Sequence, residues 1–134
     1  MTPEETELME HLAVRTDLPL REICSRLEHA LHTPPFVFDS ENETEWGIAA
    51  MDAIELNVSR PYEEGTLKEW DDSVPDGFDV GVTICVPRGA PIPSAERIAS
   101  IAQTIASALR ATVVHHRTWT GPGKNTRRET RHDP

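Results

Sequence analysis

Apolar side chains recur at helical spacing in three stretches of the chain, and each stretch predicts a helix. The stretch at residues 18–32 ends at two prolines, and Asp17 is its expected N-cap. Its buried stripe consists of Leu20, Ile23, Cys24, Leu27 and Leu31. The stretch at residues 94–110 starts at Ser94, a second expected N-cap. Its core face consists of Ile98, Ile101, Ala102, Ile105 and Leu109. A shorter acidic helix is expected at residues 2–14.

The middle of the chain changes to a period of two. Residues 54–59 and 79–86 alternate apolar and polar side chains, the pattern of strands with one solvated face. Shorter apolar runs predict further strands. These runs are residues 36–38, 45–50 and 111–119. Residues 61–78 are a long connection in which a helical turn is expected at residues 66–70, and connections of this length are usually functional or disordered.

The elements follow one another in the order α-α-β-β-β-β-α-β. This order predicts an α+β fold, a mostly antiparallel sheet of about five strands with helices packed on one face. Residues 1–119 are expected to form a single domain. Residues 120–134 are basic and have almost nothing to bury, so we expect a disordered tail.

Charge is sorted strongly along the chain. Residues 39–79 hold thirteen carboxylates and only two basic side chains, Arg60 and Lys68, a local net charge of −11 in a chain whose total is −10. A block of this kind is either a solvated surface or a surface that meets a positive partner. We favour the second interpretation, because acids that serve solubility alone are more naturally spread over the surface.

Composition narrows the function classes. No apolar run approaches the length of a membrane span, and the first residues lack the profile of a signal peptide. A chain with this net charge is repelled by phosphate, so nucleic acids and anionic membranes are disfavoured as direct partners. Cys24 and Cys85 have no metal or disulfide spacing, and we expect two reduced core thiols in a cytoplasmic protein.

No catalytic or metal-binding pattern stands out. His115 and His116 are expected to point to opposite faces of one strand, which prevents them from sharing a metal ion. The acids of the long connection are adjacent and solvated, and such carboxylates mostly stay ionised and inert. We therefore predict a protein that is not an enzyme and that has no cofactor and no metal site.

The connection at residues 61–78 interleaves acids with aromatic side chains. Exposed aromatics supply much of the energy of protein interfaces, and a rim of charge steers the encounter. The alternative is that Trp70 and Phe78 fold inward and fix the connection to the core. The residues expected to bind a partner are Tyr62, Glu63, Glu64, Glu69, Trp70, Asp71, Asp72 and Asp76.

Local strings between residues 36 and 86 resemble small immunity proteins of bacterial polymorphic-toxin and contact-dependent growth-inhibition systems. These strings lie at residues 45–47, 54–65, 70–71 and 74–78. The resemblance implies a cytoplasmic, non-enzymatic antitoxin that neutralises one cognate toxin domain, often a nuclease, whose basic surface meets the acidic one. The basic tail departs from this picture: it either binds the acidic face of its own chain or takes no part.

Two other functions stay open at this point. One is an interaction or chaperone-like domain for a secreted protein, which binds apolar helices and whose affinity is nearly independent of salt. The other is a small hydrolase that uses carboxylates of the long connection.

Overall fold

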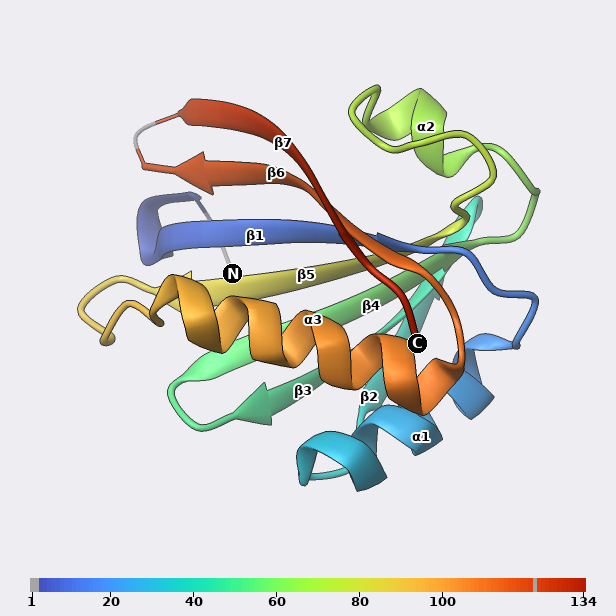
Figure 1. The fold of residues 1–134 in the computed structure, drawn as a ribbon, viewed down its shortest axis with the longest axis horizontal. Helices are drawn as coiled ribbons and strands as arrows, with labels where there is room; N and C mark the ends of the chain where they lie inside the picture. Colours follow the sequence, from blue (N-terminus) through green and yellow to red (C-terminus); the bar gives the residue numbers. More distant parts are fainter. Residues whose placement is uncertain (1–2, 122) are drawn as a thin grey trace.

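The computed structural model describes residues 3–121 and 123–134. Among these residues, seven strands form one antiparallel sheet in the order β2-β3-β4-β5-β1-β6-β7 (Figure 1). The strands are β1 (Thr6–Val14), β2 (Val37–Glu41), β3 (Thr44–Met51), β4 (Ile54–Pro61), β5 (Val80–Pro87), β6 (Val113–Thr120) and β7 (Lys124–His132). The helices are α1 (Leu20–Leu31), α2 (Leu67–Trp70) and α3 (Ala95–Leu109), after a short 3-10 turn, η1 (Pro3–Glu5).

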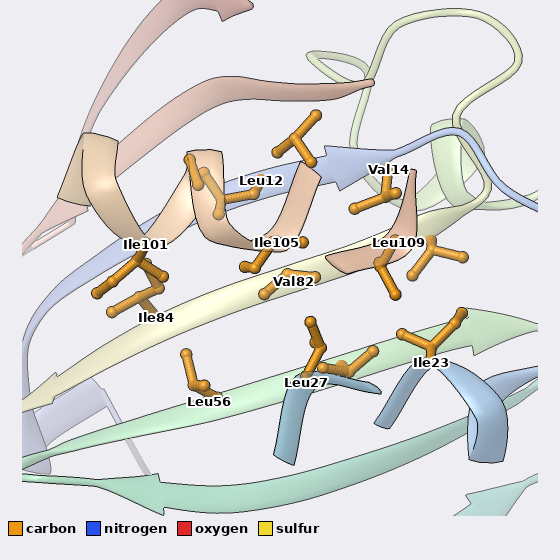
Figure 2. Close-up of a cluster of buried hydrophobic side chains, with 14 of the residues drawn as sticks. Leu12, Val14, Ile23, Leu27, Leu56, Val82, Ile84, Ile101, Ile105 and Leu109 are labelled. Atoms are coloured by element: carbon orange, nitrogen blue, oxygen red, sulfur yellow. The ribbon is translucent and has the colours of Figure 1, made fainter. Parts of the chain in front are cut away.

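Helices α1 and α3 pack side by side on one face of the sheet, which we call the helical face. Figure 2 shows Leu27 of α1 and Ile105 of α3 pointing towards Val82 of β5. All three side chains are fully buried. Helix α1 lies close to β3 at Gly47. A Cβ atom at this position would lie only 3.2 Å from Cys24 Sγ of the helix. Removing this apolar surface from water is the main stabilising contribution to the fold.

The opposite face of the sheet, the outer face, is covered only in part by the described residues. Residues 62–79, which join β4 to β5 and contain α2, lie over this face and are called the covering loop. Leu67 of this loop packs against a small cluster with Ala13 of β1 and Val114 of β6. Because side chains alternate along a strand, these two point away from the helical core that holds Val14 and Val113.

The predicted α+β class is confirmed, but the expected five strands and their order are wrong. The first error lies at residues 2–14, where a helix was expected and β1 forms; Thr2 lies outside the described residues. Strand β1 is central, with β5 on one side and β6 on the other. Its end is buried on both faces at Leu12, Ala13 and Val14, so it lacks the alternation of a strand with one wet face.

The second error lies in the expected disordered tail, of which Pro122 lies outside the described residues. Residues 124–132 form β7, which pairs along most of β6. No side chain of β7 is apolar, and all but His132 are exposed. Backbone hydrogen bonds to β6 hold this strand, and a hydrophobic pattern could not reveal it.

The remaining expected elements form close to their expected positions. The five predicted strands correspond to β2, β3, β4, β5 and β6, and the helical turn in the long connection is α2. Ser94 caps α3 as expected, accepting a hydrogen bond from Arg97 N at 3.1 Å. Asp17 is not a cap: α1 begins two residues later than such a cap requires, and Pro19 occupies the N-cap position.

Both cysteines are buried and unbonded to each other. Burial raises the pKa of Cys24 to about 12 and that of Cys85 to about 11, so neither thiol ionises near neutral pH. Within the described part of the chain, none of the helices combines the length and the apolar character needed to cross a membrane.

Candidate functional site

The covering loop has an inner and an outer side. On the inner side, Val74 and Phe78 are buried against Ala13 and Val114. On the outer side, Tyr62 is 58% exposed and Trp70 is 67% exposed. The alternative that the aromatic rings fold inward is therefore correct for Phe78 and wrong for Trp70. The apolar inner side fixes the loop, and two large aromatic rings face solvent.

Four of the expected contact residues meet in one place. They line a pocket of about 220 Å³ together with Asn42, Glu43 and Thr66, and they are Tyr62, Glu63, Glu69 and Trp70. We call this the aromatic–acidic pocket. Its position is set by the backbone, since Tyr62 N donates to Glu43 O at 3.1 Å and joins the β2–β3 turn to the start of the covering loop. Glu43 brings a third acid that the sequence analysis did not place there.

Asp71 and Asp72 face the sheet instead of the pocket. Asp71 Oδ2 accepts from Arg117 at 2.8 Å, and both side chains are largely buried at this contact. Asp72 Oδ1 accepts from Arg127 at 2.5 Å, in solvent. Through Arg127, the basic strand β7 thus binds the chain's own acidic loop, which was one of the two alternatives for the tail. Asp71 is a structural tie, whereas the exposed Asp72 pair adds little to stability. Both charges are already compensated.

The other two expected residues lie apart from the pocket lining. Asp76 pairs with Lys68 in solvent, and Glu64 is exposed. Solvated pairs such as Asp76 with Lys68 contribute little to stability, at most about 1 kcal/mol. The structure thus divides the eight expected residues into four that line one pocket, two that pair with arginines of β6 and β7, and two at the periphery.

A polar cluster that the sequence analysis missed lies beneath the covering loop. Ser73 Oγ lies 2.5 Å from Asp71 Oδ1 and 2.8 Å from His116 Nδ1. The ring of His116 lies 6.2 Å from the ring of His11, measured between centroids. A β-bulge explains the arrangement: between β1 and β6 the register shifts so that His116 is an extra residue beside Arg117. Both side chains therefore reach the covering loop.

The expectation that His115 and His116 point to opposite faces of one strand is confirmed. His115 Nε2 contacts Glu10 Oε1 at 2.9 Å in the interior, whereas His116 contacts Ser73 of the covering loop. The two rings point to different sides of the sheet. Among the described residues, no group of three or more His, Cys, Asp or Glu side chains is arranged to hold a metal ion.

The hydrogen bonds of this cluster tie the covering loop to β6. Partial burial raises the pKa of Asp71, but hydrogen bonds from Ser73 and Arg117 outweigh it and lower the pKa to about 2. An ionised Asp71 accepts a hydrogen bond from the Ser73 hydroxyl, so Ser73 Oγ in turn accepts one from His116 Nδ1. A general base needs the reverse, a ring nitrogen that accepts the serine proton. The donor and acceptor roles in these hydrogen bonds are those of a structural tie.

Comparisons with protein-family models, with curated proteins and with solved structures gave no match for this chain.

Proposed function

We propose that this chain is a non-enzymatic binding protein that neutralises a basic toxin domain in the cytoplasm, as immunity proteins do. The observation that carries the proposal is the exposure of Trp70 and Tyr62 beside three acids of the aromatic–acidic pocket. Two large rings held in solvent on a fixed loop are unfavourable for a lone protein and favourable for one that buries them in a complex.

The charge of the pocket supports a basic partner. Glu43, Glu63 and Glu69 line it, and no Lys or Arg is among its lining residues. The whole chain carries a net charge of −10, which attracts a positive surface over long range and speeds association. A nuclease is positive where it holds phosphate, so an acidic protein competes for that surface. A toxin domain of this kind is the partner that fits best.

The proposal expects the gene immediately upstream to encode a secreted protein with a basic C-terminal domain, and the test uses that domain. We expect the two proteins to co-purify and the affinity to fall as salt rises. Trp70→Ala is expected to weaken binding about 30-fold, equivalent to roughly 2 kcal/mol. Glu63→Lys combined with Glu69→Lys is expected to slow association and to flatten the salt dependence.

The matched control is Glu7→Lys combined with Glu96→Lys, which changes the net charge equally at exposed positions outside the pocket. If both charge pairs slow association alike, general charge and not this pocket governs binding. An affinity that is independent of salt would favour the chaperone-like alternative. An upstream gene for a metabolic enzyme, or a domain that does not bind, would contradict the proposal.

A further inference from the structure

The two edges of the sheet are built differently. Strand β7 presents only polar and charged side chains, which is the usual protection of an open edge against pairing with other chains. Strand β2 lacks this protection at its start, where Val37 is 73% exposed. The partner of Val37 across β3 is Ile48, so an apolar pair lies at this edge.

A shallow groove of about 690 Å³ lies over this edge. Trp46, Ile48 and Ala50 of β3 line it. Ala49 also borders the groove, but its side chain, like that of Met51, is buried in the helical core. Because side chains alternate along a strand, Trp46, Ile48 and Ala50 belong to the outer face of the sheet. Helices α1 and α3 lie on the other face, and the apolar side of the covering loop packs over β1 and β6. Trp46 adds a ring to the groove wall.

The charge at the groove selects its occupant. Asp39, Asp52 and Glu55 are among the lining residues, which include no Lys or Arg. Arg97 binds Asp52 at 2.6 Å, which leaves Asp39 and Glu55 as the acids that face an incoming chain. A second copy of this protein would bring these acids, and a net charge of −10, against their equivalents. A positively charged protein segment meets no such repulsion.

We propose that this groove is a second contact site for the basic partner, and that it takes an apolar side chain flanked by Lys or Arg. The apolar side chain lies against Val37, Trp46 and Ile48, and the flanking cations approach Asp39 and Glu55. The inference rests on the proposed function in its choice of a basic protein as partner. It adds a separate surface to the aromatic–acidic pocket.

The test needs no knowledge of the toxin. Three short peptides are titrated into isotope-labelled protein and followed by amide chemical shifts: lysine alternating with leucine and valine, lysine alternating with serine, and glutamate alternating with leucine and valine. We expect the first peptide to shift the amides of Val37, Trp46 and Ile48. Ala50→Lys, at an exposed groove position, is expected to weaken this binding about fivefold or more, and Ala50→Gln to leave it nearly unchanged.

Several results would overturn the inference. They are an equal effect of the serine peptide, an equal effect of the glutamate peptide, no effect of Ala50→Lys, and concentration-dependent shifts at the groove without peptide, which would indicate a second copy. The failures are distinguishable. If the groove fails here while Trp70→Ala still weakens toxin binding, the proposed function stands and only the second site falls. If the groove binds the lysine–leucine peptide but the upstream domain does not bind, the toxin assignment falls.

Discussion

Acidification from neutral pH to about pH 4 is expected to remove several kcal/mol of folding stability through two histidines. Burial lowers the pKa of His11 and of His116 from 6.5 to about 4. Between these values the unfolded chain binds protons that the folded chain does not, so the free energy of unfolding falls as the pH falls. Each shift corresponds to a loss of roughly 3 kcal/mol in the free energy of unfolding. This loss is absent above about pH 6.5 and complete below about pH 4.

The surroundings of the two rings explain why they stay neutral. His11 Nε2 is buried and has no hydrogen-bond partner among the described residues, so a proton there would place an unpaired charge in the interior. The charge of Arg117 opposes protonation of both rings, and that of Asp71 favours it. Because the pKa of Asp71 is about 2, this attraction is present throughout the window and does not alter its limits.

Urea unfolding at a series of pH values between 7 and 4 checks this result. The double variant His11→Asn with His116→Asn keeps a donor near each Nδ1 position but cannot titrate. Its stability is expected to change much less over the window than that of the wild type, whatever its stability at neutral pH. Parallel pH profiles for the two proteins would show that the loss arises elsewhere.

Much of the fold could be predicted from local patterns, because those elements are fixed by one-sided burial. Helix α3 has one apolar stripe and a serine cap, β4 alternates over residues 54–59, and β5 alternates until its end, where Ile84, Cys85 and Val86 are all buried. Strand β1 was not predicted as a strand, because both of its faces are buried at one end. Strand β7 was not predicted because its side chains are all polar: it is held by backbone pairing with β6 and by polar side-chain bonds from Arg117 to Asn125 and from Arg127 to Asp72. Neither feature leaves a periodic signal in the side chains.

The candidate site was predicted only in part for a related reason. Tyr62 and Trp70 could be identified because they are aromatic residues in a long acidic connection. The pairing of Asp71 with Arg117 joins residues 46 positions apart and depends on the bulge at His116. A regular strand would not place His116 and Arg117 under the same loop. An acid in a sequence can be a docking residue or a structural tie, and only the tertiary partner decides.

Replacing Asp71 by asparagine is expected to destabilise the fold by about 2 kcal/mol and to loosen the covering loop. The exposed fractions of the Asp71 and Arg117 side chains are 18% and 22%, so the replacement leaves a largely buried guanidinium without its counter-charge. It also removes the ionised acceptor of the Ser73 hydroxyl. Chemical unfolding measures the loss, and faster proteolysis within residues 62–79 reports the loosening.

The matched control is Asp72→Asn, the same chemical change one residue further on. Its pair with Arg127 is exposed, at 82% and 65%, so the expected cost is below about 1 kcal/mol. The cycle of Asp71→Asn with Arg117→Gln isolates the pairwise term, which we expect to exceed that of Asp72→Asn with Arg127→Gln. Equal costs for the two aspartates would mean that burial of the Asp71 pair contributes nothing to the loop's attachment.

The same variants separate the two roles of the acidic segment. If Asp71 acts as a tie, Asp71→Asn weakens binding of the proposed toxin domain only through a loosened loop, and a lower temperature or a stabilising osmolyte restores most of the affinity. Trp70→Ala, at a solvent-exposed ring, leaves stability nearly unchanged and its binding loss is not restored. Binding by Asp71→Asn that stays weak under stabilising conditions would instead make Asp71 a contact residue. The tie with Arg117 would then be a feature of the free protein that the partner displaces.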